Sequence, residues 1–268
     1  MQSTESTQST KPGRAVPRSR ASSQAVAIPG LGWKIWAGVW MAIGIAAAFL
    51  WVGPVVGFTM GGHGAKAFFF HMPNAWLATI TYVTGAWYAV RYLRTPRTAG
   101  LEFRSERNED DMKSAVSMEL GLLFSFLAAV TGSLFAKNEW HAYWVWTDPR
   151  MVSILVIMLI FAAYLVLRGA IEEPEKRARL TAAYALVAAI PGLFLIWVLP
   201  RIVDTLHSGP NNAVVGGGLG GNVRLVLYAF IMPAFIGLFV WLFQLRLRLM
   251  RLEARAQNPY NAPNGSLR

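Results

Sequence analysis

The sequence predicts an all-α, polytopic membrane bundle with six transmembrane helices and both termini in the cytoplasm. Of the 268 residues, 54% are hydrophobic and only 15% are charged, whereas soluble domains carry about 25% charged residues. The charged residues are clustered, which leaves long apolar stretches between them. Lys and Arg are also divided unequally between the connections that alternate along the chain. The net charge of +11 therefore indicates membrane orientation rather than nucleic-acid binding.

Six apolar stretches have the length that a transmembrane helix needs. A helix rises about 1.5 Å per residue, so about 20 apolar residues cross the hydrocarbon core. The first stretch has no charge between Ile35 and Met60. The second contains His71 but no Lys, Arg, Asp or Glu, and the third carries Glu119 near its start. The expected spans are residues 35–58, 67–90, 115–136, 151–168, 180–200 and 224–245.

The connections between these spans predict the orientation. Residues 1–34, 91–114, 168–179 and 246–268 hold 20 of the 25 Lys and Arg residues. The other side holds the remaining five: Lys66, Lys137, Arg150, Arg201 and Arg224. Cytoplasmic connections are the basic ones, so the termini are expected in the cytoplasm. We expect a disordered cytoplasmic tail over 1–32, a membrane domain over 33–246 and a second tail over 247–268, with residues 94–113 as a solvated connector.

Every histidine lies in or beside a connection on the opposite, outer side. These connections are residues 59–66, 137–150 and 201–223. Cysteine is absent, so a metal or cofactor must be held by other side chains, and histidine is the commonest metal ligand. The four histidines are His63, His71, His141 and His207.

The second outer connection contains a Trp-rich segment, which we define as residues 140–150, WHAYWVWTDPR. Trp140, Trp144 and Trp146 fall within seven residues. One interpretation is an aromatic belt at the membrane interface. The other, which we favour, is a flat apolar platform for a planar aromatic ligand, because belt residues do not need this density in one loop.

The third outer connection reads DTLHSGPNNAVVGGGLGGN and places His207 just after a helix end. Its glycines do not form a phosphate loop, since no strand precedes them. Two histidines from separate segments can hold one metal from opposite faces. Arg150, Arg201 and Lys66 are available for carboxylates. This set of groups matches haem, which has an iron with two axial positions, an apolar ring and two propionates.

These residues resemble the CcmC family of cytochrome c maturation, whose tryptophan-rich segment has the form WGxxWxWDxR between two histidines. The Trp-rich segment follows VTGSLFAKNEW, as in the family. AFFFHMPNAW and DTLHSGP resemble its two histidine regions. The resemblance spans about residues 67–210, with six helices in the same order. Two departures are His141, where the family usually has Gly, and Thr147, an apparent insertion before Asp148.

The resemblance implies that the protein binds haem b at the outer face of the bacterial inner membrane and delivers it to a haem chaperone, CcmE. It also implies the partners CcmA, CcmB and CcmD. By the match, the axial ligands are His71 and His207. The platform contains Trp140, Trp144, Trp146 and Asp148. The propionates meet Arg150 and Arg201.

Other functions stay open at this point. The family of CcsA-type cytochrome c synthases shares the tryptophan-rich segment but usually has more helices and histidines. Membrane cytochromes b place their histidines inside helices, facing each other across the bundle, whereas His207 follows Pro200 in a loop. A solute transporter would carry intramembrane charges, and only Glu119 qualifies. No activated nucleophile or acid–base pair is evident, so any promotion of haem attachment would depend on positioning.

Overall fold

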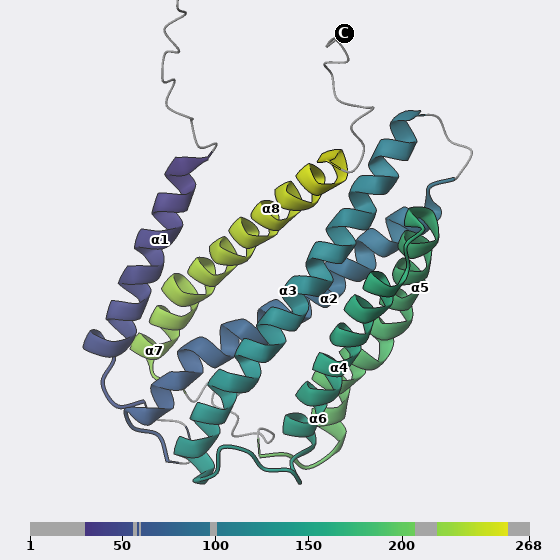
Figure 1. Ribbon diagram of the computed structural model, residues 1–268. Helices are drawn as coiled ribbons and strands as arrows, with labels where there is room; N and C mark the ends of the chain where they lie inside the picture. Colours follow the sequence, from purple (N-terminus) through teal and green to yellow (C-terminus); the bar gives the residue numbers. More distant parts are fainter. Residues whose placement is uncertain (1–29, 56–57, 59, 97–100, 207–218, 257–268) are drawn as a thin grey trace, which may run out of the picture. The chain divides into compact units, whose positions relative to one another are not determined.

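The computed structural model describes residues 30–55, 58, 60–96, 101–206 and 219–256, and these residues are almost entirely helical (Figure 1). All but residues 30–31 belong to one unit, Gly32–Arg268. No strand occurs in the described ranges. The α-helices are α1 (Leu31–Ala46), α2 (Phe68–Arg94), α3 (Leu101–Trp140), α4 (Pro149–Ala170), α5 (Pro174–Leu193), α6 (Leu199–Ile202), α7 (Gly221–Leu225) and α8 (Met232–Ala256). Shorter π or 3₁₀ segments are η1 (Ala47–Trp51), η2 (Gly64–Ala67), η3 (Phe194–Val198) and η4 (Val226–Ile231).

Five helical segments are long and apolar enough to cross a membrane, which makes the protein a multi-pass membrane protein. They are Leu31–Trp51, Arg104–Trp140, Pro149–Ala170, Pro174–Ile202 and Gly221–Ala256. The remaining expected span, residues 67–90, corresponds to α2. Helix α2 has 27 residues, which is long enough, but among the described helices it stands outside the five. Helix α2 is less apolar than those five segments, because it contains polar residues such as Asn74, Thr79 and Thr81.

The structure corrects two boundaries. The first helical segment ends at Trp51 rather than at residue 58, because the chain then turns back and Val55 pairs with Gly62 through two backbone hydrogen bonds. The stretch 94–113 is not a connector throughout, since α3 begins at Leu101. Helix α8 continues to Ala256, and most of the two expected tails lies outside the described residues.

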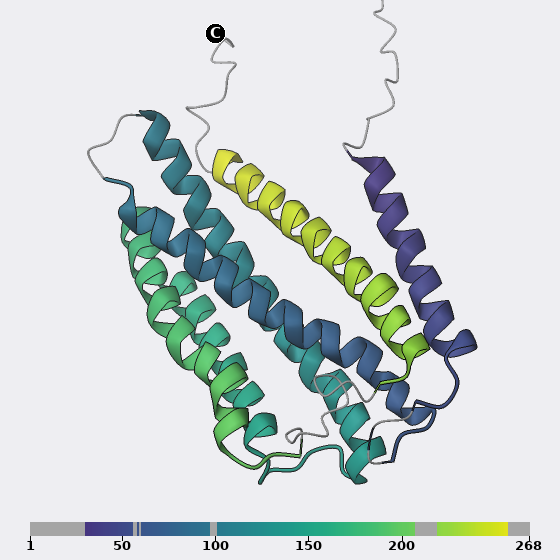
Figure 2. The ribbon, with the colours of Figure 1, turned by 180° about the vertical axis from the view of Figure 1, so that it is seen from behind.

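Helices α2 and α3 run side by side in opposite directions and form the centre of the bundle (Figures 1 and 2). Both contribute to the two buried apolar clusters. One cluster also contains α7, η4 and α8, and the other contains α4 and α5. The centre is therefore a helix pair that the other helices cover from two sides.

Small side chains let these helices approach closely, as in other membrane bundles. The hydroxyl of Ser114 on α3 donates to the Gly85 carbonyl of α2 over 3.0 Å. A Cβ atom at Gly121 of α3 would stand 2.3 Å from Cε1 of Phe161 on α4, so only glycine fits there. These contacts fix the register of α3 against its neighbours.

One end of the bundle, which we call the charged end, is joined by ion pairs that start from the first part of α3 (upper end in Figure 1). Acidic residues on α3 pair with arginines of α2, α4 and α8. The pairs are Asp110 with Arg91, Asp111 with Arg168, and Glu109 and Glu119 with Arg251 and Arg246, respectively. We call the opposite end, which carries the Trp-rich segment, the loop end.

The Asp111→Asn substitution is expected to lower the stability of the folded bundle. Both oxygens of Asp111 accept from Arg168, over 2.8 and 2.7 Å, and both side chains are largely buried. Charge-assisted hydrogen bonds of this kind contribute about 1.5–3 kcal/mol. The midpoint of thermal unfolding in detergent would measure the loss. Glu172→Gln, at an exposed position between α4 and α5, is the matched control, and an equal loss there would contradict the assignment.

Candidate functional site

His71 lies in the first turns of α2 at the loop end, and its imidazole faces α3. Its Nδ1 is 2.9 Å from the carbonyl oxygen of Ala128. A carbonyl oxygen only accepts, so Nδ1 carries the hydrogen and, in the neutral ring, Nε2 carries the lone pair. Histidines that bind metals through one nitrogen commonly donate from the other in this way.

The ring of His71 fits against α3 because residue 132 is glycine. A Cβ atom at Gly132 would stand 2.8 Å from both Cε1 and Nδ1 of His71, closer than real Cβ atoms approach. On the same helix, the buried Phe135 ring lies parallel to the imidazole, with an interplanar angle of 6° and centroids 6.4 Å apart. Ala128 and Gly132 of α3 therefore lie against one edge of the imidazole, and Phe135 lies parallel to its plane.

The tryptophans of the Trp-rich segment occupy different environments. Trp140, at the end of α3, packs edge-on against Phe135 with ring centroids 6.0 Å apart. Trp144 and Trp146 lie together, with centroids 5.9 Å apart. Trp146 is 72% exposed. The indole N–H of Trp144 is buried and has no hydrogen-bond partner in the described part of the chain.

Asp148 is buried and its carboxylate binds backbone rather than forming part of an exposed surface. One oxygen accepts from Met151 N over 2.9 Å, which caps the start of α4 with Pro149 in the first helical position. The other oxygen accepts from Leu206 N over 2.7 Å. Thr147 is exposed in the turn before it. Asp148 therefore joins the start of α4 to the residue that precedes His207.

Two arginines, Arg150 and Arg201, lie near the start of α4. Arg150, in the first turn of α4, is within electrostatic range of His71 and of Arg201. Arg201 on α6 donates to the Trp197 carbonyl, and its guanidinium lies 5.4 Å from the centroid of the Trp197 ring. Two neighbouring positive charges favour an anionic group between them.

The connection between η1 and η2 is attached to the end of α3 by Glu139 and Asn138. The buried Glu139 carboxylate accepts from Met60 N and Gly61 N, each over 3.1 Å. The side-chain amide of Asn138 donates to the Gly61 carbonyl over 3.1 Å. Gly61 has a φ of +58° and its Cβ position would lie 2.6 Å from the Val55 carbonyl oxygen, so the turn requires glycine.

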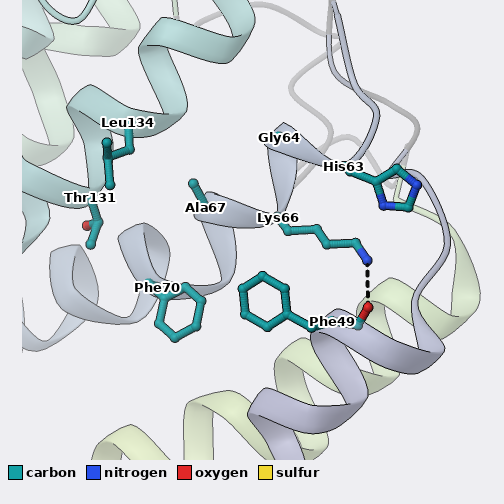
Figure 3. A pocket seen from close by; sticks show the side chains of 8 residues that line it. All are labelled: Phe49, His63, Gly64, Lys66, Ala67, Phe70, Thr131 and Leu134. Atoms are coloured by element: carbon teal, nitrogen blue, oxygen red, sulfur yellow. Dashed lines mark hydrogen bonds between the residues drawn. The ribbon is translucent and has the colours of Figure 1, made fainter.

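A pocket of about 390 Å³ lies next to this connection, between η1, η2 and α3 (Figure 3). Its lining includes the rings of Phe49 and Phe70 and the exposed His63. Lys66 Nζ donates to the carbonyls of Phe49 and Val52 over 3.2 and 2.6 Å. The lining contains Lys66 but none of the expected axial ligands or platform residues.

His141 is exposed and follows the last residue of α3. Its φ of +58° is the one positive value at a non-glycine position within the described residues. Glycine is the usual residue directly after a helix in this left-handed conformation. His141 therefore stands, in place of the family's usual glycine, at a position whose backbone conformation favours glycine.

The His141→Gly substitution is expected to stabilise the protein. The left-handed conformation costs most residues about 1–2 kcal/mol, so glycine should raise the free energy of unfolding by up to about 1 kcal/mol. Denaturant unfolding in detergent would measure the gain. His63→Gly is the matched control: His63 is also exposed but has a φ of −72°, where glycine brings no gain. Equal effects at both positions would contradict the explanation.

His207 lies outside the described residues. Of the expected site residues within them, Arg150 lies within electrostatic range of His71 and Arg201, Trp144 packs with Trp146, and Trp140 packs on Phe135. Sequence reasoning missed Gly132 and the Ala128 carbonyl. A glycine inside an apolar helix was a signal for the first, whereas every residue has a carbonyl, so nothing marks the second.

Nearly the whole chain is similar to one known protein family. A family profile described as "Heme exporter protein C", CcmC, matches residues 23–261. The chain belongs to the heme exporter protein C family. The matched range contains all the described helices, the four histidines and the Trp-rich segment. The resemblance that the three motifs predicted is therefore confirmed.

Individual members of the heme exporter protein C family are similar over most of their length. The protein of that name from Bradyrhizobium diazoefficiens is 32% identical over 197 residues, which cover 74% of this chain and 70% of that protein. The one from Paracoccus denitrificans is 26% identical over 221 residues, covering 78% and 84%. The one from Escherichia coli K12 is 26% identical over 184 residues, covering 66% and 69%.

Proposed function

We propose that the protein holds haem b at the outer, periplasmic face of the bacterial inner membrane and delivers it to a CcmE-like haem chaperone during cytochrome c maturation. His71 and His207 are the axial ligands. CcmA, CcmB and a small CcmD-like protein are its partners, together with the lipid bilayer. Helix α2 is the sixth span, and both termini are cytoplasmic, in agreement with the unequal distribution of Lys and Arg.

The observation that carries the proposal is the meeting of three distant segments at the loop end. His71 comes from α2, Arg150 from the start of α4, and Leu206 from the connection after α6. Arg150 acts electrostatically on His71, and Asp148 joins Leu206 to the start of α4. Leu206, which precedes His207 in the chain, is thus bound at the start of α4, and Arg150 at that same helix start is within electrostatic range of His71.

The residues present fit haem in three respects. The hydrogen bond from His71 to Ala128 leaves the lone pair on Nε2, the nitrogen that coordinates. Tyr143 and Trp146, which are 57% and 72% exposed, offer apolar surface for a planar ring. The buried Trp144 N–H, without a partner among the described residues, is a donor that a ligand carboxylate would satisfy.

Haem supplies an iron with two axial positions and an edge where covalent attachment takes place. The chain supplies orientation. Arg150 and Arg201 would bind the haem carboxylates. Because His71 lies near the start of α2, a bound ring would remain accessible from the periplasm. No nucleophile of this chain takes part, so promotion of attachment depends on positioning.

The test is haem transfer by the purified protein. Reconstituted with haem in detergent, the protein should show the absorption spectrum of a six-coordinate, low-spin haem. Mixed with a purified chaperone of the CcmE type, it should lose this haem while covalent haem appears on the chaperone, detected by mass spectrometry. A haem that remains in place and is reduced by quinol would instead identify a cytochrome b. Direct attachment to an apocytochrome would identify a synthase.

A further inference from the structure

The geometry points to Gly132 and the Ala128 carbonyl as a positioning element for His71, which we call the imidazole seat. The inference deepens the proposed function, on which it rests. The seat fixes both the tautomer and the orientation of the imidazole before haem binds. Its two parts act differently: the glycine leaves room for the ring, and the carbonyl binds its Nδ1 hydrogen.

The first step is the spacing of the two residues. Ala128 and Gly132 are four positions apart on α3, so they lie on one face of the helix, one turn from each other. His71 contacts both: Nδ1 is 2.9 Å from the Ala128 oxygen and 2.8 Å from the place where a Cβ of Gly132 would stand. The Ala128 carbonyl therefore binds this edge of the ring, and the absence of a side chain at Gly132 leaves space for it.

The second step is the orientation of the ring. The place of the Gly132 Cβ is 2.8 Å from Cε1 and Nδ1 but 3.6 Å from Nε2. Hence the edge formed by Nδ1 and Cε1 faces α3, and Nε2 is the nitrogen further from it. The Phe135 ring lies parallel to the imidazole, with the ring centroids 6.4 Å apart. A ring held at one edge presents its other nitrogen in a fixed direction.

The third step is the consequence of a side chain at residue 132. Alanine favours a helix more than glycine does, by about 1 kcal/mol, so Gly132→Ala would ordinarily stabilise α3. Here the added methyl group needs the space of the imidazole, and the ring must move away from the Ala128 carbonyl. Loss of such an outer partner of a metal ligand typically costs about 10–100-fold in affinity.

The first test is spectroscopic and uses the full-length protein. Gly132→Ala should bind haem about 10–100-fold more weakly, with a larger high-spin fraction, and added imidazole should restore the low-spin spectrum. Gly121→Ala is the matched control, because it also introduces a clash on α3, with Phe161, away from the site. It should reduce stability and leave the haem spectrum low-spin. An unchanged spectrum in Gly132→Ala, or equal changes in both variants, would overturn the seat.

The second test needs no haem. In a thermal unfolding cycle on the apoprotein, Gly132→Ala should lower the unfolding midpoint when His71 is present and raise it when His71 is already alanine. The same sign in both backgrounds would overturn the seat. The two proposals fail distinguishably: a low-spin spectrum that survives His71→Ala ends the ligand assignment and the seat with it. A spectrum lost in His71→Ala and intact in Gly132→Ala ends the seat alone.

Discussion

Alanine at His71 or at His207 is expected to abolish the low-spin haem spectrum and to lower the haem content of the purified protein at least about tenfold. By the proposed assignment, each substitution removes one of two imidazoles, and an iron left with one strong ligand would change its spin state and dissociate more readily. The measurement is the absorption spectrum together with haem per protein after purification in detergent. Haem transfer to the chaperone should fall in parallel.

The chain provides its own controls, because it has four histidines. His63 and His141 are both exposed at the loop end, and alanine at either position should leave the spectrum intact. If His63→Ala removed the low-spin signal and His71→Ala did not, the haem would belong to the pocket beside η2 instead. Unchanged spectra in both His71→Ala and His207→Ala would remove the basis of the proposed function.

The Asp148→Ala substitution is expected to have the second largest effect, on both stability and haem binding. It removes the cap of α4, which contributes about 0.5–2 kcal/mol. It also leaves Leu206 N without the acceptor that holds it at 2.7 Å, at a cost of about 1–3 kcal/mol if that group stays buried. The unfolding midpoint and the haem content of the same preparation should therefore both decrease.

Asp148→Asn separates the two roles of this carboxylate. Asparagine is as good a helix cap as aspartate, but it has one acceptor oxygen where aspartate has two. We expect α4 to keep its start and its stability to fall little, while the segment at Leu206 is released and haem binds more weakly. If Asp148→Asn were as unstable as Asp148→Ala but retained full haem affinity, Asp148 would have no part in positioning the second ligand.

The helices were largely predictable, and the exceptions have physical reasons. Length and apolar composition identify a span, but they do not show where a helix ends. The first helix was expected to reach residue 58 because residues up to Met60 are uncharged, yet it ends at Trp51, where Lys66 binds the carbonyls at its end. Helix α3 was expected to start near residue 115, because its first turns are polar. The ion pairs that stabilise those turns involve residues far apart in sequence.

The candidate site was predictable in its chemistry but less so in its arrangement. The aromatic cluster and His71 were evident from residue type and spacing. The place of Asp148 on the platform stays a prediction, whereas its bonds to Met151 N and Leu206 N could not be predicted, because a motif shows that an aspartate is present but not which N–H groups it binds. The partners of His71 were not evident, because one is a main-chain carbonyl and the other is the absence of a side chain. Both follow only from the register of α2 against α3.

The length of α3 has a mechanical consequence. A helix of 40 residues measures about 60 Å, roughly twice the hydrocarbon thickness of a bilayer. It is a single rod whose first turns carry Glu109 and Asp110 and whose last turns carry Ala128 and Gly132. A force applied to α3 at the charged end therefore reaches the residues that contact the imidazole of His71 without leaving one continuous helix. A protein that binds the charged end of α3 would therefore act on the surroundings of His71 through this one helix.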